Sequence, residues 1–166
     1  MKFKAFALPI LSQCDMTLAA PQALVVAPTR ELALQVAEAF GSYAKQFKGF
    51  NVTTIYGGQD YRIQLKSLKR GPQVIVGTPG RLLDQMKREN IDTTHMKTVI
   101  LDEADEMLKM GFIEDIETIL DFLPKNKQTG LFSATMPAAI QKIAKRYLKD
   151  PEKIIIKPCK QQKKNI

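Results

Sequence analysis

Short apolar runs alternate along the chain with stretches of helical length, and this alternation limits the possible folds more than any other feature. Each run has the length of a strand and is rich in β-branched or other apolar residues. The five clearest runs are Ala23–Ala27, Val52–Tyr56, Val74–Val76, Thr98–Leu101 and Thr129–Phe132. Strands that alternate with helices form a mainly parallel sheet with helices on both faces. We therefore predict an α/β fold.

Two of the intervening stretches have the periodicity of an amphipathic helix. The first extends from Glu31 to about Phe47. The second places apolar residues on one face at Ile140, Ile143, Ala144, Tyr147 and Leu148. Its opposite face carries Lys142, Lys145, Arg146 and Lys149. A sixth apolar run, Ile154–Ile156, follows this helix and is a further candidate strand.

Composition indicates one globular domain with an uneven distribution of charge. The chain has 166 residues, of which 45% are hydrophobic and 25% charged, and it contains no apolar run as long as a membrane helix. The net charge is +8, and nearly all of it comes from residues 142–166. A basic end suits a polyanion such as nucleic acid, or it acts only as a solubilising tail. The widely separated Cys14 and Cys159 are expected to be free thiols in the cytoplasm.

The strand at Thr98–Leu101 is followed directly by Asp102-Glu103-Ala104-Asp105. Ligands of open parallel sheets bind at the carboxyl ends of the strands. There Asp102 is a candidate ligand for Mg²⁺, and Glu103 is placed to orient or deprotonate a water that attacks a phosphate. The alternative is a helix that starts with acidic residues, which its dipole favours.

Other strands end in groups that suit phosphate binding. Thr29-Arg30 and Thr78-Pro79-Gly80-Arg81 each place a helix start and an arginine together, and Gly57-Gly58 allows close backbone approach. Ordinary helix caps and a tight turn would explain the same residues. Two hydroxyls, Ser133 and Thr135, follow the last of the five runs.

Taken in order, these motifs resemble the first RecA-like domain of DEAD-box ATP-dependent RNA helicases, most closely the bacterial cold-shock type. The resemblance extends from about Ala5 to Ile156 and rests on the order and spacing of five motifs. They are Pro28–Ala33, Gly57-Gly58, Thr78–Arg81, Asp102–Asp105 and Ser133–Thr135. It implies a RecA-like, P-loop NTPase type of sheet, with RNA as partner and ATP and Mg²⁺ as cofactors.

The resemblance also implies roles for individual residues. Asp102 would hold Mg²⁺ through water, and Glu103 would position the hydrolytic water, so both belong to the catalytic and nucleotide site. Ser133 and Thr135 would couple hydrolysis to strand separation. One RNA strand would be held by its sugar-phosphate backbone, whatever its sequence, at Thr29, Arg30, Gly57, Gly58, Thr78, Gly80 and Arg81.

Several parts of the family pattern do not occur in this sequence. The phosphate-binding loop G-x-x-x-x-G-K-[ST] is absent, and alignment puts Lys2 at the loop lysine and Phe3 at the Mg²⁺-binding Ser/Thr. Nucleotide binding is therefore not assigned to Lys2. The adenine-reading motif, the first strand and the second RecA-like domain are missing too. Loss of that strand predicts unpaired strand edges or repacking around a gap.

We accordingly expect a partial N-terminal RecA-like helicase domain at 1–156, followed by a basic, disordered tail or interdomain linker at 157–166. The chain by itself is not expected to be a competent helicase. Three possibilities stay open at this stage: half of an ATP-dependent enzyme, a nucleotide-independent RNA-binding remnant, or a non-functional truncated product.

Overall fold

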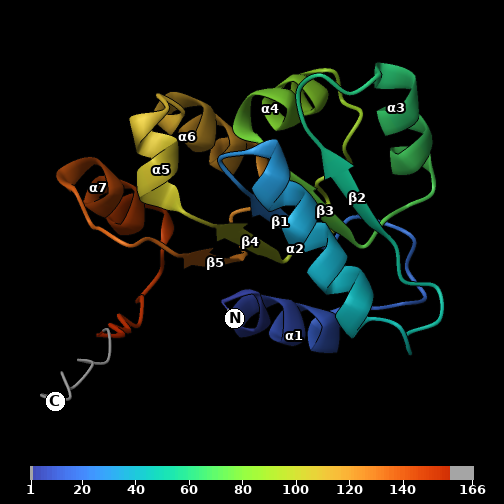
Figure 1. The fold of residues 1–166 in the computed structure, drawn as a ribbon, viewed down its shortest axis with the longest axis horizontal. Helices are drawn as coiled ribbons and strands as arrows, with labels where there is room; N and C mark the ends of the chain where they lie inside the picture. The colour runs from blue at the N-terminus through green and yellow to red at the C-terminus, as the bar shows by residue number, and fades with distance from the viewer. Residues whose placement is uncertain (1, 158–166) are drawn as a thin grey trace, which may run out of the picture.

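A computed structural model describes residues 2–157 and contains a five-stranded, fully parallel sheet (Figure 1). The order across the sheet is β2-β3-β1-β4-β5. The strands are β1 (Ala23–Val26), β2 (Val52–Ile55), β3 (Val74–Gly77), β4 (Thr98–Leu101) and β5 (Gln128–Leu131). All five predicted runs form strands, and the predicted α/β class is confirmed.

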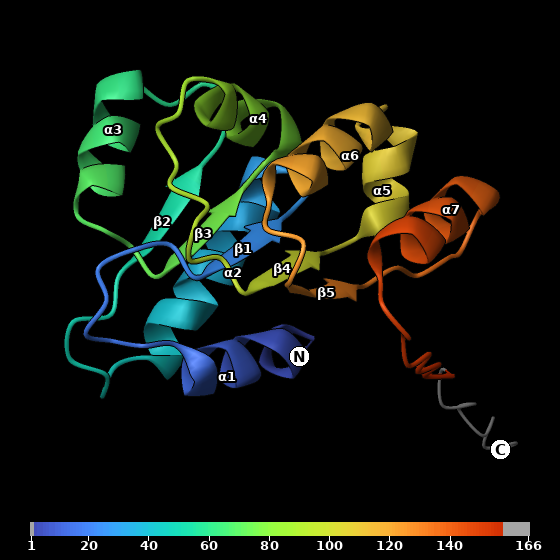
Figure 2. The same cartoon turned by 180° about the vertical axis from the view of Figure 1, so that it is seen from behind.

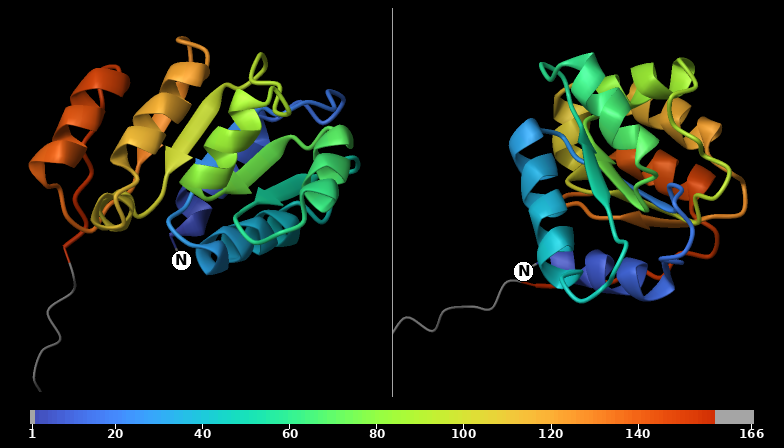
Figure 3. Two further views of the ribbon diagram at one scale, coloured as in Figure 1. Left: turned by 90° about the horizontal axis from the view of Figure 1, so that it is seen from above. Right: turned by 90° about the vertical axis from the view of Figure 1, so that its right-hand side faces the viewer.

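Seven helices in the described part of the chain cover the two faces of the sheet (Figures 2 and 3). One face is covered by α1 (Phe3–Gln13) and α2 (Arg30–Tyr43). The helices on the opposite face are α3 (Tyr61–Lys69), α4 (Pro79–Lys87), α5 (Ala104–Lys109), α6 (Ile113–Phe122) and α7 (Ala138–Tyr147). This is the layered arrangement that a parallel sheet requires.

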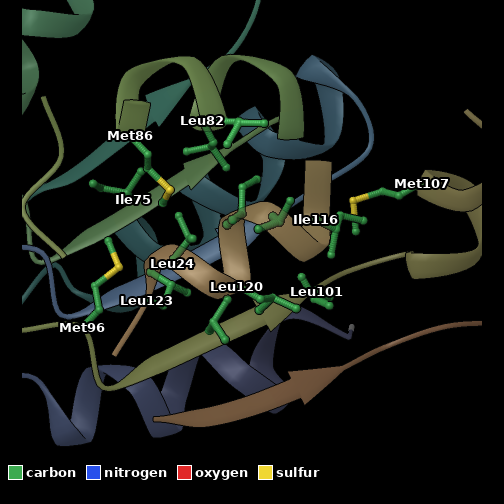
Figure 4. Close-up of a cluster of buried hydrophobic side chains, with 14 of the residues drawn as sticks. Leu24, Ile75, Leu82, Met86, Met96, Leu101, Met107, Ile116, Leu120 and Leu123 are labelled. Atoms are coloured by element: carbon green, nitrogen blue, oxygen red, sulfur yellow. The ribbon is translucent and has the colours of Figure 1, made fainter. Parts of the chain in front are cut away.

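The strands divide their side chains between two apolar cores. Leu24 and Val26 of β1 face the helices α4 to α7, in the cluster shown in Figure 4, whereas Ala23 and Val25 face α1 and α2. Every residue of β1 and β3 is buried. Burial on both faces explains why these strands are continuous apolar runs without the alternation of a half-exposed sheet.

Two elements differ from the sequence prediction. Helix α2 ends at Tyr43 rather than near Phe47, and the Phe47 side chain is exposed. The run Ile154–Ile156 forms no strand, and its three side chains are at least 69% exposed. A β-branched run becomes a strand only where a neighbouring strand pairs with it, and within residues 2–157 nothing pairs with this one. Cys159 and nearly all of the predicted tail lie outside the described residues.

The sheet has no internal gap, and among the described residues its two edge strands are β2, which pairs only with β3, and β5. Within residues 2–157, β5 pairs only with β4, and its side chains are no more than half-buried. None of the described helices is long and apolar enough to cross a bilayer.

Candidate functional site

The register of the sheet brings five strand ends to one level. Val26 pairs with both Gly77 and Leu101, Ile55 pairs with Gly77, and Leu101 pairs with Leu131. We call the edge formed by these five residues, with the loops that follow them, the carboxyl edge. Every motif singled out in the sequence follows one of these strands and therefore lies along this edge.

Thr29 and Arg30 open α2 directly after β1. Thr29 is the N-cap, and its Oγ1 accepts a hydrogen bond of 3.2 Å from the Leu32 amide. The exposed Arg30 places its guanidinium 5.0 Å from the centre of the Tyr56 ring. In the part of the chain that the structure describes, Arg30 pairs with no carboxylate. Its position is held by a cap and an aromatic ring, which leave its charge uncompensated.

Two glycines at the carboxyl edge are not required by the fold. A Cβ at Gly57 or Gly80 would meet no atom within 4 Å, and neither residue has a positive φ. Gly80 lies inside α4, where glycine costs about 0.5–1 kcal/mol relative to alanine. Gly58 differs, since its φ of +84° favours glycine. The small size of Gly57 and Gly80 leaves open space on the outer surface, which suits a ligand that approaches the backbone closely.

Thr78 is the N-cap of α4 and Pro79 its first residue, as predicted, but the Thr78 side chain makes no capping hydrogen bond. Arg81 follows in the first turn. Its Nη1 donates to the Gln59 backbone oxygen at 3.1 Å and to Gln64 Oε1 at 3.2 Å, and its guanidinium lies 4.6 Å from the centre of the Tyr61 ring. Within residues 2–157 it has no carboxylate partner either.

Sequence reasoning missed the residues that hold Arg81. The sequence does not predict that Gln64, Gln85 and Tyr61 belong to the site, because a polar residue on an amphipathic helix suggests a solvent-facing position. The structure instead buries Gln64 and Gln85 completely between α3 and α4. Only their three-dimensional contacts distinguish these two residues from surface glutamines; their sequence context does not.

Asp102 follows β4 and is a fully buried carboxylate. Neither carboxylate oxygen has a hydrogen-bond partner among the described residues, although Lys2 Nζ lies 3.2 Å from Oδ1. Burial raises the pKa of Asp102, and the nearby Lys2 charge only partly offsets this effect. An ionised carboxylate buried without hydrogen bonds is costly. The orphaned oxygens fit a hydrated cation at this position.

The described residues supply only part of a magnesium-nucleotide site. No cluster of three or more His, Cys, Asp or Glu side chains suited to a metal occurs within residues 2–157, so other oxygens would have to complete the coordination of Mg²⁺. These residues contain no loop of the G-x-x-x-x-G-K-[ST] pattern either. The described residues are therefore better suited to hold a Mg²⁺ ion than to hold the phosphates of a nucleotide.

Glu103 adopts a left-handed backbone conformation, with φ 51° and ψ 52°. It stands at the N-cap of α5 but makes no side-chain capping bond, and its half-exposed carboxylate meets Lys2 Nζ at 3.0 Å. Such a conformation costs a non-glycine residue roughly 1–2 kcal/mol. The simple alternative of an acidic N-cap does not describe Glu103, whose side chain points to Lys2 rather than to the helix amides.

Asp105 connects the acidic motif to Ser133 and Thr135. Its Oδ2 accepts hydrogen bonds from the Thr135 amide at 3.1 Å and from Thr135 Oγ1 at 2.8 Å. The Asp105 amide donates to Ser133 Oγ at 3.1 Å. Burial alone would raise the pKa of Asp105, but the bonds to Thr135 and Ser133 outweigh it and lower that pKa. The ends of β4 and β5 are thus linked directly.

Comparison with known proteins identifies the family of this chain. Residues 2–143 match the family model described as DEAD/DEAH box helicase. The chain is 56% identical over 155 residues to the ATP-dependent RNA helicases DeaD of Escherichia coli and of Buchnera aphidicola from Schizaphis graminum. These matches cover 93% of this chain but only 25% and 26% of those proteins. The chain thus spans about a quarter of their length.

Solved structures show the same fold. A DEAD box protein from Methanococcus jannaschii superposes with a TM-score of 0.85 at 44% identity, over 90% of this chain and 40% of that one. The yeast DEAD-box splicing factor Prp28 gives 0.83 at 33% identity, over 89% of this chain and 37% of that one. The fold is therefore the RecA-like domain of these proteins.

Proposed function

Because this chain belongs to the DEAD/DEAH box helicase family, we propose that it forms the RNA-gripping and magnesium-binding part of an ATP-dependent RNA helicase. The named relatives are ATP-dependent RNA helicases, and a chain that spans a quarter of their length corresponds to one part of that activity. We assign residues 1–156 to the first helicase domain and 157–166 to a basic tail or linker, in the cytoplasm.

One observation carries the RNA assignment. Three neighbouring strand ends, those of β1, β2 and β3, present two arginines without carboxylate partners in the described residues and two glycines that the fold does not need. Free positive charge and close backbone approach favour phosphate groups rather than bases. The proposed contacts are Thr29, Arg30, Gly57, Gly58, Thr78, Gly80 and Arg81.

The ends of β4 and β5 are proposed to serve the nucleotide. Asp102 would hold Mg²⁺ through water, and the ion would neutralise phosphate charge when bound. Glu103, exposed at the same edge, would orient the attacking water. Ser133 and Thr135 would couple hydrolysis to strand separation, and Asp105 ties both of them to the acidic motif.

A second candidate function, nucleotide-independent RNA binding, is favoured by a separate observation. The contacts that hold Arg30 and Arg81 are made within residues 2–157, and none of them involves the acidic motif at Asp102–Asp105.

RNA binding is tested by fluorescence anisotropy with a labelled single-stranded oligonucleotide. We expect sequence-independent affinity that falls steeply with salt. The double variant Arg30→Gln/Arg81→Gln should bind at least about tenfold more weakly. Lys142→Gln/Lys145→Gln on the exposed face of α7 removes the same charge as a control. An equal loss of RNA affinity in both double variants would mean that binding depends only on the overall positive charge, and it would contradict the proposal.

Nucleotide binding is tested by titration with a fluorescent ATP analogue and Mg²⁺. Saturable binding that Asp102→Asn abolishes would support the magnesium assignment. Absence of binding up to millimolar nucleotide, together with intact RNA binding, would leave the nucleotide-independent function for this chain.

A further inference from the structure

We propose that Gln64 is a positioning residue that pre-organises Arg81 and the loop after β2 for RNA. This inference rests on the proposed RNA-binding function and adds to it a residue outside the family motifs described above. Gln64 lies on α3 and is completely buried. It connects the end of β2 to α4, the two elements that carry Gly57-Gly58 and Arg81.

All four hydrogen-bonding positions of the Gln64 side chain are used. Its Nε2 donates to the Tyr56 backbone oxygen and to Gln59 Oε1, both at 2.9 Å. Its Oε1 accepts from Gln85 Nε2 at 2.9 Å and from Arg81 Nη1 at 3.2 Å. A glutamine amide has two donors and two acceptor sites, so no capacity is left over. Such a saturated network favours one arrangement of its members.

The network fixes the arginine without neutralising it. Arg81 is held by the neutral oxygens of Gln64 and Gln59 and by the ring of Tyr61. A carboxylate in the place of Gln64 would hold the guanidinium equally well but would compensate its charge. Because the Arg81 side chain is already ordered, RNA binding would not lose conformational entropy by immobilising it. An amide is thus the group that combines order with free charge.

The same amide sets the distance between two RNA-contacting segments. Tyr56 and Gln59 flank Gly57-Gly58, and both are bonded to Gln64. Gln85 supports Gln64 from α4 and is itself bonded by Asn90 Nδ2 at 2.8 Å. The glycine loop and the start of α4 are consequently parts of one rigid unit.

Gln73 provides a matched control in the same sheet. It is also a buried glutamine, whose Oε1 accepts from the Asn51 amide at 2.8 Å and whose Nε2 donates to the Gly49 and Leu18 backbone oxygens at 3.1 and 3.4 Å. These contacts lie before β2 and β3, at the opposite end of the strands from Arg81. Gln73 thus shares the structural role of a buried amide and lacks any link to the arginine.

The test compares Gln64→Met and Gln73→Met in the RNA-binding assay across a salt series. We expect Gln64→Met to raise the RNA Kd about tenfold, as loss of an ordered charged contact would. The slope of log affinity against log salt should fall by about 0.7 for one lost phosphate contact on a single strand. Gln73→Met should lower thermal stability while leaving Kd and slope unchanged.

A double-mutant cycle with Arg81→Gln separates positioning from general destabilisation. Because Gln64 acts partly through Arg81 and partly through the glycine loop, Gln64→Met should cause a clearly smaller loss of affinity in the Arg81→Gln background than in the unaltered chain. An equal loss in both backgrounds, or an unchanged Kd for Gln64→Met, would overturn the inference. An Arg81→Gln variant that binds RNA normally would instead contradict the proposed function itself.

A measurement on the unaltered chain covers the case in which Gln64→Met does not fold. NMR relaxation of the arginine Nε groups should report Arg81 as more rigid than the exposed Arg62 on α3. Equal mobility of the two side chains in the RNA-free protein would refute pre-organisation.

Discussion

The two halves of the carboxyl edge differ in the partners that hold their charged side chains. On the half formed by β1, β2 and β3, Arg30 and Arg81 are held by neutral groups, and the buried Gln64 amide behind Arg81 is saturated with hydrogen bonds. On the half formed by β4 and β5, Asp102 is buried without hydrogen bonds and has only the Lys2 ammonium, 3.2 Å from its Oδ1, as a charged partner, and Glu103 has a strained backbone. One half is held in place by its own contacts, whereas the other contains a buried charge that Lys2 offsets only in part.

This difference reflects what each half is proposed to bind: a polyanion at the arginines and a cation at the carboxylate. Groups that meet a long, flexible polyanion gain from being ordered in advance, and neutral partners can order them without removing their charge. A carboxylate that receives a cation gains from having no hydrogen bonds that compete for its oxygens, and the surrounding fold carries the cost of burying it. The following substitutions test this contrast, starting with the largest expected effect.

Gly77→Ala should be the most damaging of these changes, although it lies at the same edge as Gly80. A Cβ at Gly77 would overlap the Ile55 backbone oxygen and approach Leu82 Cγ to 2.7 Å. We expect the free energy of unfolding to fall by about 3 kcal/mol, because backbone cannot move aside as a side chain can. Urea unfolding measures it, and an unchanged midpoint would mean that β2 and β3 separate more easily than the register implies.

Asp105→Ala should be the next most damaging, and its effect should depend on pH. Loss of the bonds to Thr135 is expected to cost about 2 kcal/mol at pH 7. Because the folded-state pKa of Asp105 is lowered, its contribution is present above the ordinary value of 3.8 and is lost as pH falls through the folded value. Unfolding curves should therefore converge in acid, and the exposed Glu106→Ala is the control. A pH-independent gap would contradict this.

Asp102→Asn, three residues before Asp105, should stabilise the protein rather than destabilise it. The amide removes a buried charge that lacks hydrogen bonds, while Lys2 keeps its contact with Glu103. We expect the free energy of unfolding at pH 7 to rise by about 1 kcal/mol, since a neutral group is cheaper to bury. Thermal unfolding without Mg²⁺ is the measurement. A destabilised variant would mean that the ion pair with Lys2 outweighs the cost of burial.

Gly80→Ala should have the smallest effect on stability but should separate stability from binding. The added methyl group meets open space, and alanine favours the helix by roughly 0.5 kcal/mol. The variant should be slightly more stable and should bind RNA severalfold more weakly, because the methyl group would occupy the space left for the sugar-phosphate backbone. A gain in stability with unchanged RNA affinity would exclude Gly80 from the interface.

Much of the framework was predictable because it depends on local patterns. The runs that became β1 and β3 are apolar on both faces, and Thr29 and Thr78 occupy the helix starts that their sequence context favours. Once strands and helices alternate in a parallel sheet, the motifs after each strand must meet at one edge.

The remaining features depend on contacts between distant residues. Ile154–Ile156 has the composition of a strand but no neighbour within the described residues. Gln64 has the composition of a surface position, but α4 packs over it. The approach of Lys2 to Asp102 joins residues a hundred positions apart. Local propensity specifies none of these arrangements.

The most direct test of RNA contact at the β1–β3 half is an NMR titration of the uniformly ¹⁵N-labelled chain with a short single-stranded RNA. The largest amide shifts are predicted at Thr29-Arg30, Gly57–Gln59 and Thr78–Arg81, with little change along α7. Shifts confined to the basic residues from Lys142 onward would contradict the proposed interface and assign RNA binding to the basic C-terminal region.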